Sequence, residues 1–294
     1  MSSSFFRITE HVLPCQHIRE YRDALNVDKL LQLAIQQYTH LNNSNPLSNP
    51  ITLIAAHGNG LPKGCYEPLW DELITAMALP IKSIRITDCF HQGASGILNE
   101  VGIAYSFSCS QFFHLDVWAS RVEAEEFLRK SPFFQLWESK AMEIYLQFGL
   151  RSTPTLLYPS RSFPRGVTLT TNKAQEAWTF LSLNAPPPSL NPQDSVERAL
   201  GNGLSCNSAE GDFNYWGHAT NCPWACLAFK FLPSVRLVVL LLFGENSHIS
   251  RPLRREDKLR CIGIGLGGSG GVAMGRVRAE TIQGTTHVLP IEKI

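Results

Sequence analysis

The sequence ITLIAAHGNG at residues 51–60 and the sequence IKSIRITDCFHQGAS at residues 81–95 are both apolar, β-prone runs that end in a polar loop containing glycine. Each run predicts a buried strand followed by a loop. Residues 66–79 between them carry apolar side chains at helical spacing, which predicts an amphipathic helix. Strand, helix and strand in this order favour a parallel sheet, whose ligand sites lie at the carboxyl ends of the strands. We therefore expect the two glycine-containing loops to meet at one edge of the sheet.

Two regions of different character follow in the chain. Residues 120–150 repeat apolar side chains at helical intervals, with Pro132 separating two helices, and predict a helical insertion. Residues 185–214 include PPPSLNP and show little periodicity, so we expect a linker without regular structure. The chain then divides into a first part of the core, a helical cap with its linker, and a second part of the core, at residues 1–112, 113–205 and 206–294.

The C-terminal part repeats the arrangement of a strand before a polar loop. Residues 235–243 are a continuous apolar run of the kind that is covered on both faces, and they end at Gly244–His248. A mixed-charge helix is expected at residues 251–260. A glycine-rich loop at residues 263–275 and a last strand at residues 277–282 follow it.

The composition excludes several classes of protein. The 294 residues are 44% hydrophobic and 17% charged, which provides for a core and argues against long disorder. A formal net charge of +1 supplies no basic surface for nucleic acid. The longest apolar run is far shorter than the roughly 18 to 20 residues that cross a bilayer, so no transmembrane segment is expected. The N-terminus lacks the pattern of a secretory signal.

The eight cysteines stand mostly singly in apolar surroundings, which favours buried free thiols over a disulfide framework. Cys222 and Cys226 have C-x3-C spacing, with His218 before them, which leaves zinc as an alternative. No second ligand pair stands at the spacing of a zinc finger, so we expect no metal.

The glycine-rich loop matches two functional patterns. Gly263–Gly268 fits the dinucleotide-binding pattern G-x-G-x-x-G, and Gly267–Gly271 around Ser269 fits the nucleophile pattern G-x-S-x-G. Both patterns need a strand before the turn and a helix after it. Here a charged helix is expected before the loop and more glycines follow, so a surface loop is the better interpretation. Nucleotide binding is the weakest of three functions that the sequence leaves open.

A serine in a better context is Ser106, within VGIAYSFSC at residues 101–109. A β-prone run leads into it, and small residues stand two positions before and after it, where a sharp nucleophile turn leaves little room. These residues are Ala104 and Ser108 rather than glycines, and a Cβ is costly where φ is positive. The bare pattern therefore favours the alternative, an ordinary serine in a strand.

Histidines stand at two places that catalysis would use. The sequence HGNG at residues 57–60 resembles an oxyanion loop, in which backbone N–H groups approach a developing negative charge, although it also occurs as a plain turn. His287 follows the last strand and a Gly-Thr-Thr turn, although a lone histidine is more often structural. Oxyanion loop, serine, polar loop and histidine follow one another as they do in α/β-hydrolases.

Longer motifs carry a resemblance to a known family. They are EHVLPCQHIREY (10–21), AAHGNGLPKGCYEPLWDEL (55–73), HQGASGILNE (91–100), VTLTTNKAQEAWTFL (167–181) and GTTHVLPIEK (284–293). Through them the chain resembles fungal α/β-hydrolases that include peroxisomal lipase-like proteins and the hydrolases of Alternaria host-selective toxin clusters of the AK-, AF- and ACT-toxin type. The resemblance covers most of the chain apart from roughly residues 185–230.

The resemblance implies an α/β fold of the α/β-hydrolase type, a mostly parallel sheet with a helical cap insertion. The implied site residues are Ser106 as nucleophile, His287 as general base, and the backbone N–H groups of Asn59 and Phe107 as the oxyanion hole. No cofactor is implied.

The acid of the triad is open between two residues. Glu245 is our prediction because it ends the strongest strand, and Asp116 is the alternative. The gap from Asp88 to Val101 barely meets the minimum of about 10 to 12 residues for a βαβ crossover. We therefore expect a core that is shorter than in the family.

Two functions from different classes follow. The first is a serine hydrolase that acts on an ester or thioester of a hydrophobic, fatty-acid-derived carboxylic acid, in host-selective toxin biosynthesis as the resemblance implies. The second is a catalytically impaired relative that binds an acyl ligand or a partner. The terminal Glu292-Lys293-Ile294 is similar to an SKL-type address and, with the resemblance, predicts a peroxisomal protein that an import receptor recognises, and otherwise a cytoplasmic one.

Overall fold

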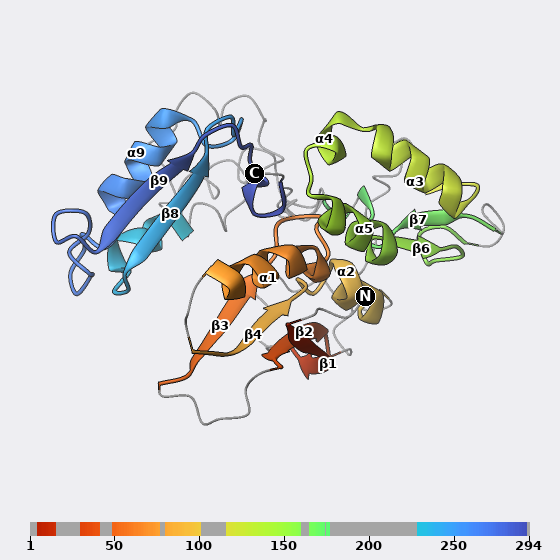
Figure 1. Cartoon of the computed structure of the whole chain (residues 1–294), viewed down its shortest axis with the longest axis horizontal. Helices are drawn as coiled ribbons and strands as arrows, with labels where there is room; N and C mark the ends of the chain where they lie inside the picture. The colour runs from red at the N-terminus through yellow and green to blue at the C-terminus, as the bar shows by residue number, and fades with distance from the viewer. Residues whose placement is uncertain are drawn as a thin grey trace, which may run out of the picture. The chain divides into compact units, whose positions relative to one another are not determined.

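The computed structural model describes residues 5–15, 30–41, 49–76, 80–100, 116–159, 165–173, 175–176 and 228–292 (Figure 1). The chain forms two compact units, of which the first is Met1–Ala177 with Pro290–Lys293 and the second is Trp178–Leu289 with Ile294. The linker predicted at residues 185–214 lies outside the described residues.

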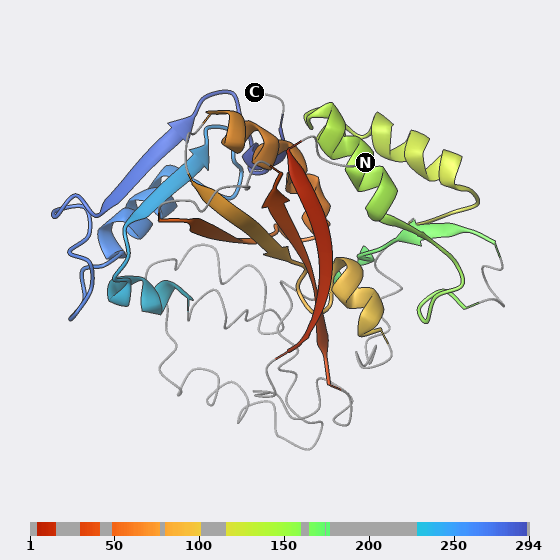
Figure 2. The same ribbon diagram turned by 60° about the horizontal axis from the view of Figure 1, so that its bottom comes forward.

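A four-stranded sheet forms the centre of the first unit (Figure 2). Its order is β1 (Phe6–Pro14), β2 (Gln32–His40), β4 (Ile81–Thr87) and β3 (Ile51–Ala56). β3 and β4 are parallel, as the sequence predicts, whereas β1 and β2 add two antiparallel pairings that were not predicted. β2 buries Ala34, Gln36 and Tyr38 at every second position, the period of a strand with one covered face.

The crossover from β3 to β4 runs through a short 3₁₀ helix, η1 (Lys63–Tyr66), and then α1 (Glu67–Ala76) (Figure 1). This confirms the helix predicted between the two strands. After β4 the chain enters α2 (Gly93–Leu98), a short helix whose Ser95 hydroxyl accepts a hydrogen bond of 2.8 Å from the backbone N–H of Ala34 in β2. This hydrogen bond holds α2 against the sheet. The helix lies within the short segment between Asp88 and Val101.

The helices predicted at residues 120–150 are confirmed, as three rather than two: α3 (Arg121–Lys130), α4 (Pro132–Gln135) and α5 (Ser139–Phe148). Ser120 caps α3 because its hydroxyl accepts a hydrogen bond of 3.2 Å from the N–H of Glu123. Pro132 stands at the first turn of α4, where the missing N–H removes no helical hydrogen bond.

A small antiparallel sheet accompanies these helices. It has the order β5 (Val117–Trp118), β7 (Val167–Leu169) and β6 (Leu150–Ser152). Among the helices in the described ranges, none is long and apolar enough to cross a membrane.

The second unit contains the parallel pair β8 (Val239–Gly244) and β9 (Val277–Ile282) with helix α9 (Pro252–Cys261) between them in the chain. Both strands and the helix are as predicted, although β8 begins at Val239 rather than at residue 235. Leu240 and Leu242 are 58% and 49% exposed, so β8 is not covered on both faces as its apolar sequence suggested. The alternation of a strand places these two side chains on the same, less covered face.

Candidate active site

The HGNG loop follows β3 and depends on its two glycines. Gly60 has a φ of +76°, and a Cβ there would lie 2.8 Å from Oε1 of Glu176. A Cβ on Gly58 would lie 3.1 Å from Cδ1 of Leu61. The loop is therefore closely packed, and glycine is required at position 60 for both its conformation and its space.

His57 joins the two glycine-containing loops. Its Nε2 accepts a hydrogen bond of 2.7 Å from the backbone N–H of Cys89, which follows β4. The proton must then be on Nδ1, which lies 2.7 Å from the carbonyl oxygen of Gly58 and donates to it. The contact confirms that the two loops meet at one edge of the sheet. Because both ring nitrogens are engaged, His57 holds the loops together and is not positioned as a general base.

The amide groups of Gly58 and Gly60 donate to side chains of the protein. The Gly58 N–H donates to the hydroxyl of Tyr66 at 2.7 Å, and the Gly60 N–H donates to Oε1 of Gln92 at 2.9 Å. The Asn59 side chain donates from Nδ2 to the carbonyl oxygen of Glu176 at 3.2 Å and accepts at Oδ1 from Gln92. The role of the Asn59 backbone N–H in an oxyanion hole stays a prediction. The amides of Gly58 and Gly60 on either side of it are held by hydrogen bonds.

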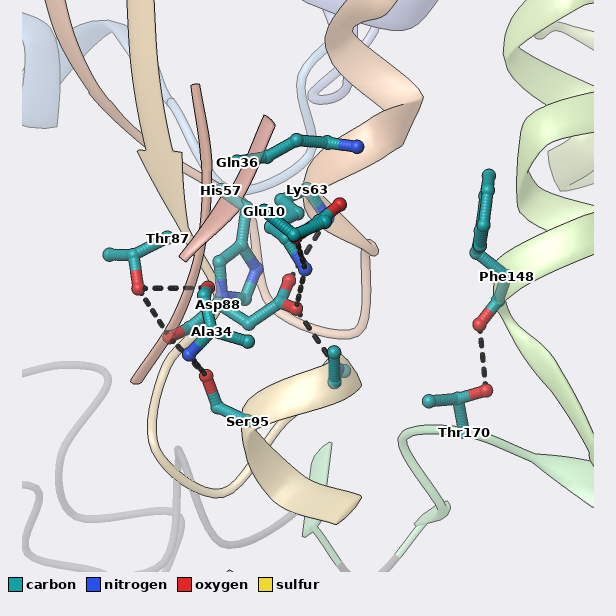
Figure 3. A network of polar contacts seen from close by, with 12 residues as sticks. Glu10, Ala34, Gln36, His57, Lys63, Thr87, Asp88, Ser95, Phe148 and Thr170 are labelled. Atoms are coloured by element: carbon teal, nitrogen blue, oxygen red, sulfur yellow. Dashed lines mark hydrogen bonds and ion pairs between the residues drawn. The ribbon is translucent and has the colours of Figure 1, made fainter. Parts of the chain in front are cut away.

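Asp88, at the end of β4, is a buried carboxylate that the sequence did not single out (Figure 3). It accepts hydrogen bonds from the backbone N–H of Lys63 at 3.0 Å, from Nζ of Lys63 at 2.9 Å and from the backbone N–H of Ala94 at 2.9 Å. Gly93 has a φ of +53°, and a Cβ there would lie 2.5 Å from the carboxyl carbon of Asp88. Through these hydrogen bonds Asp88 holds η1 and the start of α2 against the end of β4.

Burial shifts the pKa of two groups beside the loop. It lowers the pKa of His91 to about 4. The ring of His91 is therefore neutral at physiological pH. Burial also raises the pKa of the Glu176 carboxyl above its ordinary value, an effect that Lys173 partly opposes.

His287 lies in the second unit, after β9 and its turn. Its Nδ1 lies 3.3 Å from the hydroxyl of Ser247, and its ring is 6.0 Å from that of His248 in an edge-on arrangement. The hydroxyl of Ser247 also accepts a hydrogen bond of 3.2 Å from the N–H of Ser250. The loop after β8 and the turn after β9 therefore meet at the carboxyl ends of this strand pair.

The two predicted acids both accept hydrogen bonds from other residues of the chain. Oε2 of Glu245 accepts from the N–H of Gly284 at 2.9 Å and ties the end of β8 to the turn after β9. Asp116, in the first unit, is buried, and its carboxylate accepts from the hydroxyl of Tyr158 and, at 3.1 Å, from the N–H of Lys173. The role of either residue as triad acid stays a prediction.

Several residues that the sequence singles out lie outside the described residues: Ser106, Phe107, His218, Cys222 and Cys226. In the part of the chain that the structure does describe, no group of three or more His, Cys, Asp or Glu side chains is arranged to hold a metal ion. Four cysteines there are free thiols, of which Cys65 is buried and Cys89 is exposed.

The glycine-rich loop lies between α9 and β9, so neither of the patterns it matches has the strand before it and the helix after it that they need. It folds back on the chain, with the N–H of Ser269 donating to the carbonyl oxygen of Val235 at 2.8 Å. A loop is what the sequence predicts.

Sequence comparison relates the chain to fungal thioesterases. Type I acyl-CoA thioesterase mpaH of Penicillium roqueforti (strain FM164) is 26% identical over 383 residues, covering 100% of this chain and 86% of the relative. Type I acyl-CoA thioesterase mpaH of Penicillium brevicompactum is 27% identical over 387 residues, with the same coverage of 100% and 86%. Both alignments are longer than the 294 residues of this chain, so the relatives hold segments that it lacks. No protein-family model matches the chain.

Structural comparison gives a similarity to the peroxisomal α/β-hydrolase Lpx1 of Saccharomyces cerevisiae. The TM-score is 0.67 at 12% sequence identity, and the match covers 99% of this chain and 85% of Lpx1. At this identity the similarity concerns the fold alone. The chain therefore has the α/β-hydrolase fold, and both mpaH and Lpx1, to which it is similar, are fungal hydrolases.

Proposed function

We propose that the chain is a serine hydrolase that cleaves the thioester or ester of a hydrophobic, fatty-acid-derived carboxylic acid, with an acyl-CoA thioester as the first candidate substrate. The similarity to the mpaH acyl-CoA thioesterases extends over the whole chain and supports a hydrolase enzyme. The structural observation that supports it most is the HGNG loop. It is closely packed, it follows a parallel strand, and the amides on both sides of Asn59 are bound within the protein.

The proposed reaction proceeds through an acyl-enzyme. Ser106 Oγ attacks the carbonyl carbon while His287 takes its proton, and the backbone N–H groups of Asn59 and Phe107 stabilise the oxyanion. The C–S or C–O bond to the leaving group then breaks, and His287 returns the proton to the thiolate or alkoxide. Water, activated by the same histidine, hydrolyses the acyl-Ser106 ester and releases the carboxylic acid. No cofactor takes part.

The acid that orients His287 is proposed as Glu245, with Asp116 as the alternative. Glu245 belongs to the same unit as His287 and follows β8 directly. Its contact with Gly284 fixes the turn that leads to His287, so it influences the histidine through the backbone as well.

The cellular role is a further part of the proposal. Peroxisomal import by a receptor for the terminal tripeptide agrees with the peroxisomal origin of Lpx1, and a cytoplasmic location is the alternative. Glu292, the first residue of the tripeptide, is buried and forms a β-bridge with Trp137, so a receptor would have to open this contact. A part in host-selective toxin biosynthesis rests on the resemblance of the sequence motifs.

Turnover of octanoyl-CoA and p-nitrophenyl octanoate tests the assignment. We expect Ser106→Ala and His287→Ala to lose at least about a thousandfold in kcat. Ser269→Ala, which removes the serine of the G-x-S-x-G match in the glycine-rich loop, is the control and should keep the wild-type rate. Equal rates in the wild type and Ser106→Ala would refute the nucleophile, and loss of activity in Ser269→Ala alone would move it to the glycine-rich loop.

The second candidate function is an impaired relative that binds an acyl ligand without turning it over. It is favoured by the gaps in this chain relative to mpaH, which mean that segments of the relatives are missing. A wild-type chain that binds octanoyl-CoA but hydrolyses neither substrate would support this function against the first.

A further inference from the structure

Gln92 is a buried glutamine that stands at the N-cap of α2, only 1% exposed. A side chain at this position usually accepts a hydrogen bond from its own helix, but that of Gln92 makes no such cap. Its carboxamide is directed at the HGNG loop instead. Oε1 accepts from the N–H of Gly60 at 2.9 Å, and Nε2 donates to Oδ1 of Asn59.

The orientation of this carboxamide is fixed by its neighbours. Nε2 of Gln92 also lies 3.3 Å from Nε2 of His91. The neutral ring of His91 can accept a hydrogen bond there from the second N–H of the Gln92 amide. If the amide were reversed, its NH₂ group would face the N–H of Gly60 and its oxygen would face Oδ1 of Asn59. Gln92 therefore presents one acceptor and one donor to the loop in a single arrangement, which neither a carboxylate nor an apolar side chain can reproduce.

Asn59 is held on its other side as well. Its Nδ2 donates to the carbonyl oxygen of Glu176 at 3.2 Å, while the preceding amide, that of Gly58, donates to Tyr66 at 2.7 Å. The side chain of Asn59 and the amides on both sides of its own are thus tied to the protein. Gln92 makes two of these contacts. A catalytic donor must lie within about 0.5 Å of its productive place, so contacts of this kind decide how well the loop works.

We infer that Gln92 is a positioning residue, which holds the backbone of Asn59 in the orientation that oxyanion binding needs. This inference rests on the proposed function. Gln92 acts through the loop and touches no reacting atom. Its effect should fall on the transition state, where charge develops on the carbonyl oxygen, more than on binding of the ground state.

The test compares Gln92→Met and Gln92→Glu with a matched control, Gln36→Met. Gln36 is also buried, at 6% exposure, and accepts from the hydroxyl of Tyr38, which retains Glu67 as a second acceptor at 3.3 Å. Three quantities are measured: kcat and KM with octanoyl-CoA, the inhibition constant of a trifluoromethyl ketone analogue of the octanoyl thioester, and hydrogen exchange at the Gly60 amide.

For Gln92→Met we expect kcat to fall about 10- to 100-fold with KM within about twofold of the wild type. The affinity for the trifluoromethyl ketone should fall by the same factor as kcat/KM. The Gly60 amide should exchange at least about tenfold faster because its acceptor is gone. Gln92→Glu keeps that acceptor and loses the donor to Asn59, so a smaller fall in kcat is expected at unchanged Gly60 exchange. Gln36→Met should match the wild type.

An unchanged kcat in Gln92→Met, or an equal loss in Gln36→Met, would overturn the inference. If Gln92→Met does not fold, Gln92→Glu decides in its place: a loss of kcat at a wild-type melting temperature supports the inference, and a wild-type kcat refutes it. Ser106→Ala separates this result from the proposed function. If Ser106→Ala is inactive while the Gln92 variants are fully active, only the role of Gln92 is wrong; if Ser106→Ala is fully active, the serine mechanism itself is wrong.

Discussion

The carboxylate of Asp88 and the ammonium group of Lys63 are both buried, with side-chain exposures of 1% and 8%. Removing one partner of such a pair leaves the other charged and unpaired in a medium of low dielectric. The free-energy cost of that unpaired charge is larger than the net stabilisation that the pair provides. The contact of Asp88 with Lys63 (Figure 3) is therefore important for the loops around it, because Asp88 also accepts hydrogen bonds from the backbone N–H groups of Lys63 and Ala94.

Asp88→Asn is expected to lower the free energy of unfolding by about 3 to 5 kcal/mol, because Lys63 loses its closest carboxylate. Adding Lys63→Met should recover a large part of this loss. Urea unfolding measures both variants. The control is Glu143→Gln, which breaks the exposed pair with Arg129 and should cost less than about 1 kcal/mol. Similar losses in Asp88→Asn and Glu143→Gln would contradict the account.

At the scale of the elements, the sequence predicts the strand, loop, helix and strand at residues 51–87 because the signals are local. Apolar runs and helical periodicity are visible within each segment. β1 and β2 were not predicted. β2 has a glutamine, Gln36, at a buried position, which interrupts the apolar alternation that would identify the strand.

In the candidate site, too, the sequence predicts the features that have a local signal and misses the others. The motifs predict roles for Asn59 and His287, and the prediction that two loops meet at one edge is confirmed by the contact of His57 with Cys89. The contacts of Asp88 with Lys63 and of Gln92 with Gly60 join residues that are 25 and 32 positions apart in the sequence. No local pattern reports such contacts, because they arise only when the sheet is assembled.

The start of α2 depends on a glycine for two separate reasons. Gly93→Ala would place a Cβ at positive φ and against the Asp88 carboxyl, 2.5 Å from its carbon atom. At Gly275 the φ is also positive, at +65°, but a Cβ would meet nothing within 4 Å. We expect Gly275→Ala to cost about 1 to 2 kcal/mol, from backbone strain alone, and Gly93→Ala to cost at least about 2 kcal/mol more.

Thermal unfolding of the two alanine variants gives this comparison directly. The difference between them isolates the packing of α2 against Asp88 from the cost of the left-handed conformation. Equal decreases in melting temperature would show that the end of β4 tolerates a side chain at position 93.

At the scale of the whole molecule, the chain has an α/β-hydrolase fold and lacks segments that the aligned thioesterases hold. The fold places polar loops at the carboxyl ends of two parallel strand pairs, β3 with β4 and β8 with β9, where this architecture carries its sites. The HGNG loop follows β3 in the first unit, and His287 follows β9 in the second.

Mass spectrometry of the acylated protein tests the serine mechanism most directly. After brief mixing of the wild-type chain with octanoyl-CoA and an acid quench, the account predicts an added octanoyl group that peptide fragmentation places on Ser106. The adduct should be absent in Ser106→Ala and should accumulate when hydrolysis is slowed at low temperature. An octanoyl group on another residue, or turnover by Ser106→Ala at the wild-type rate, would contradict it.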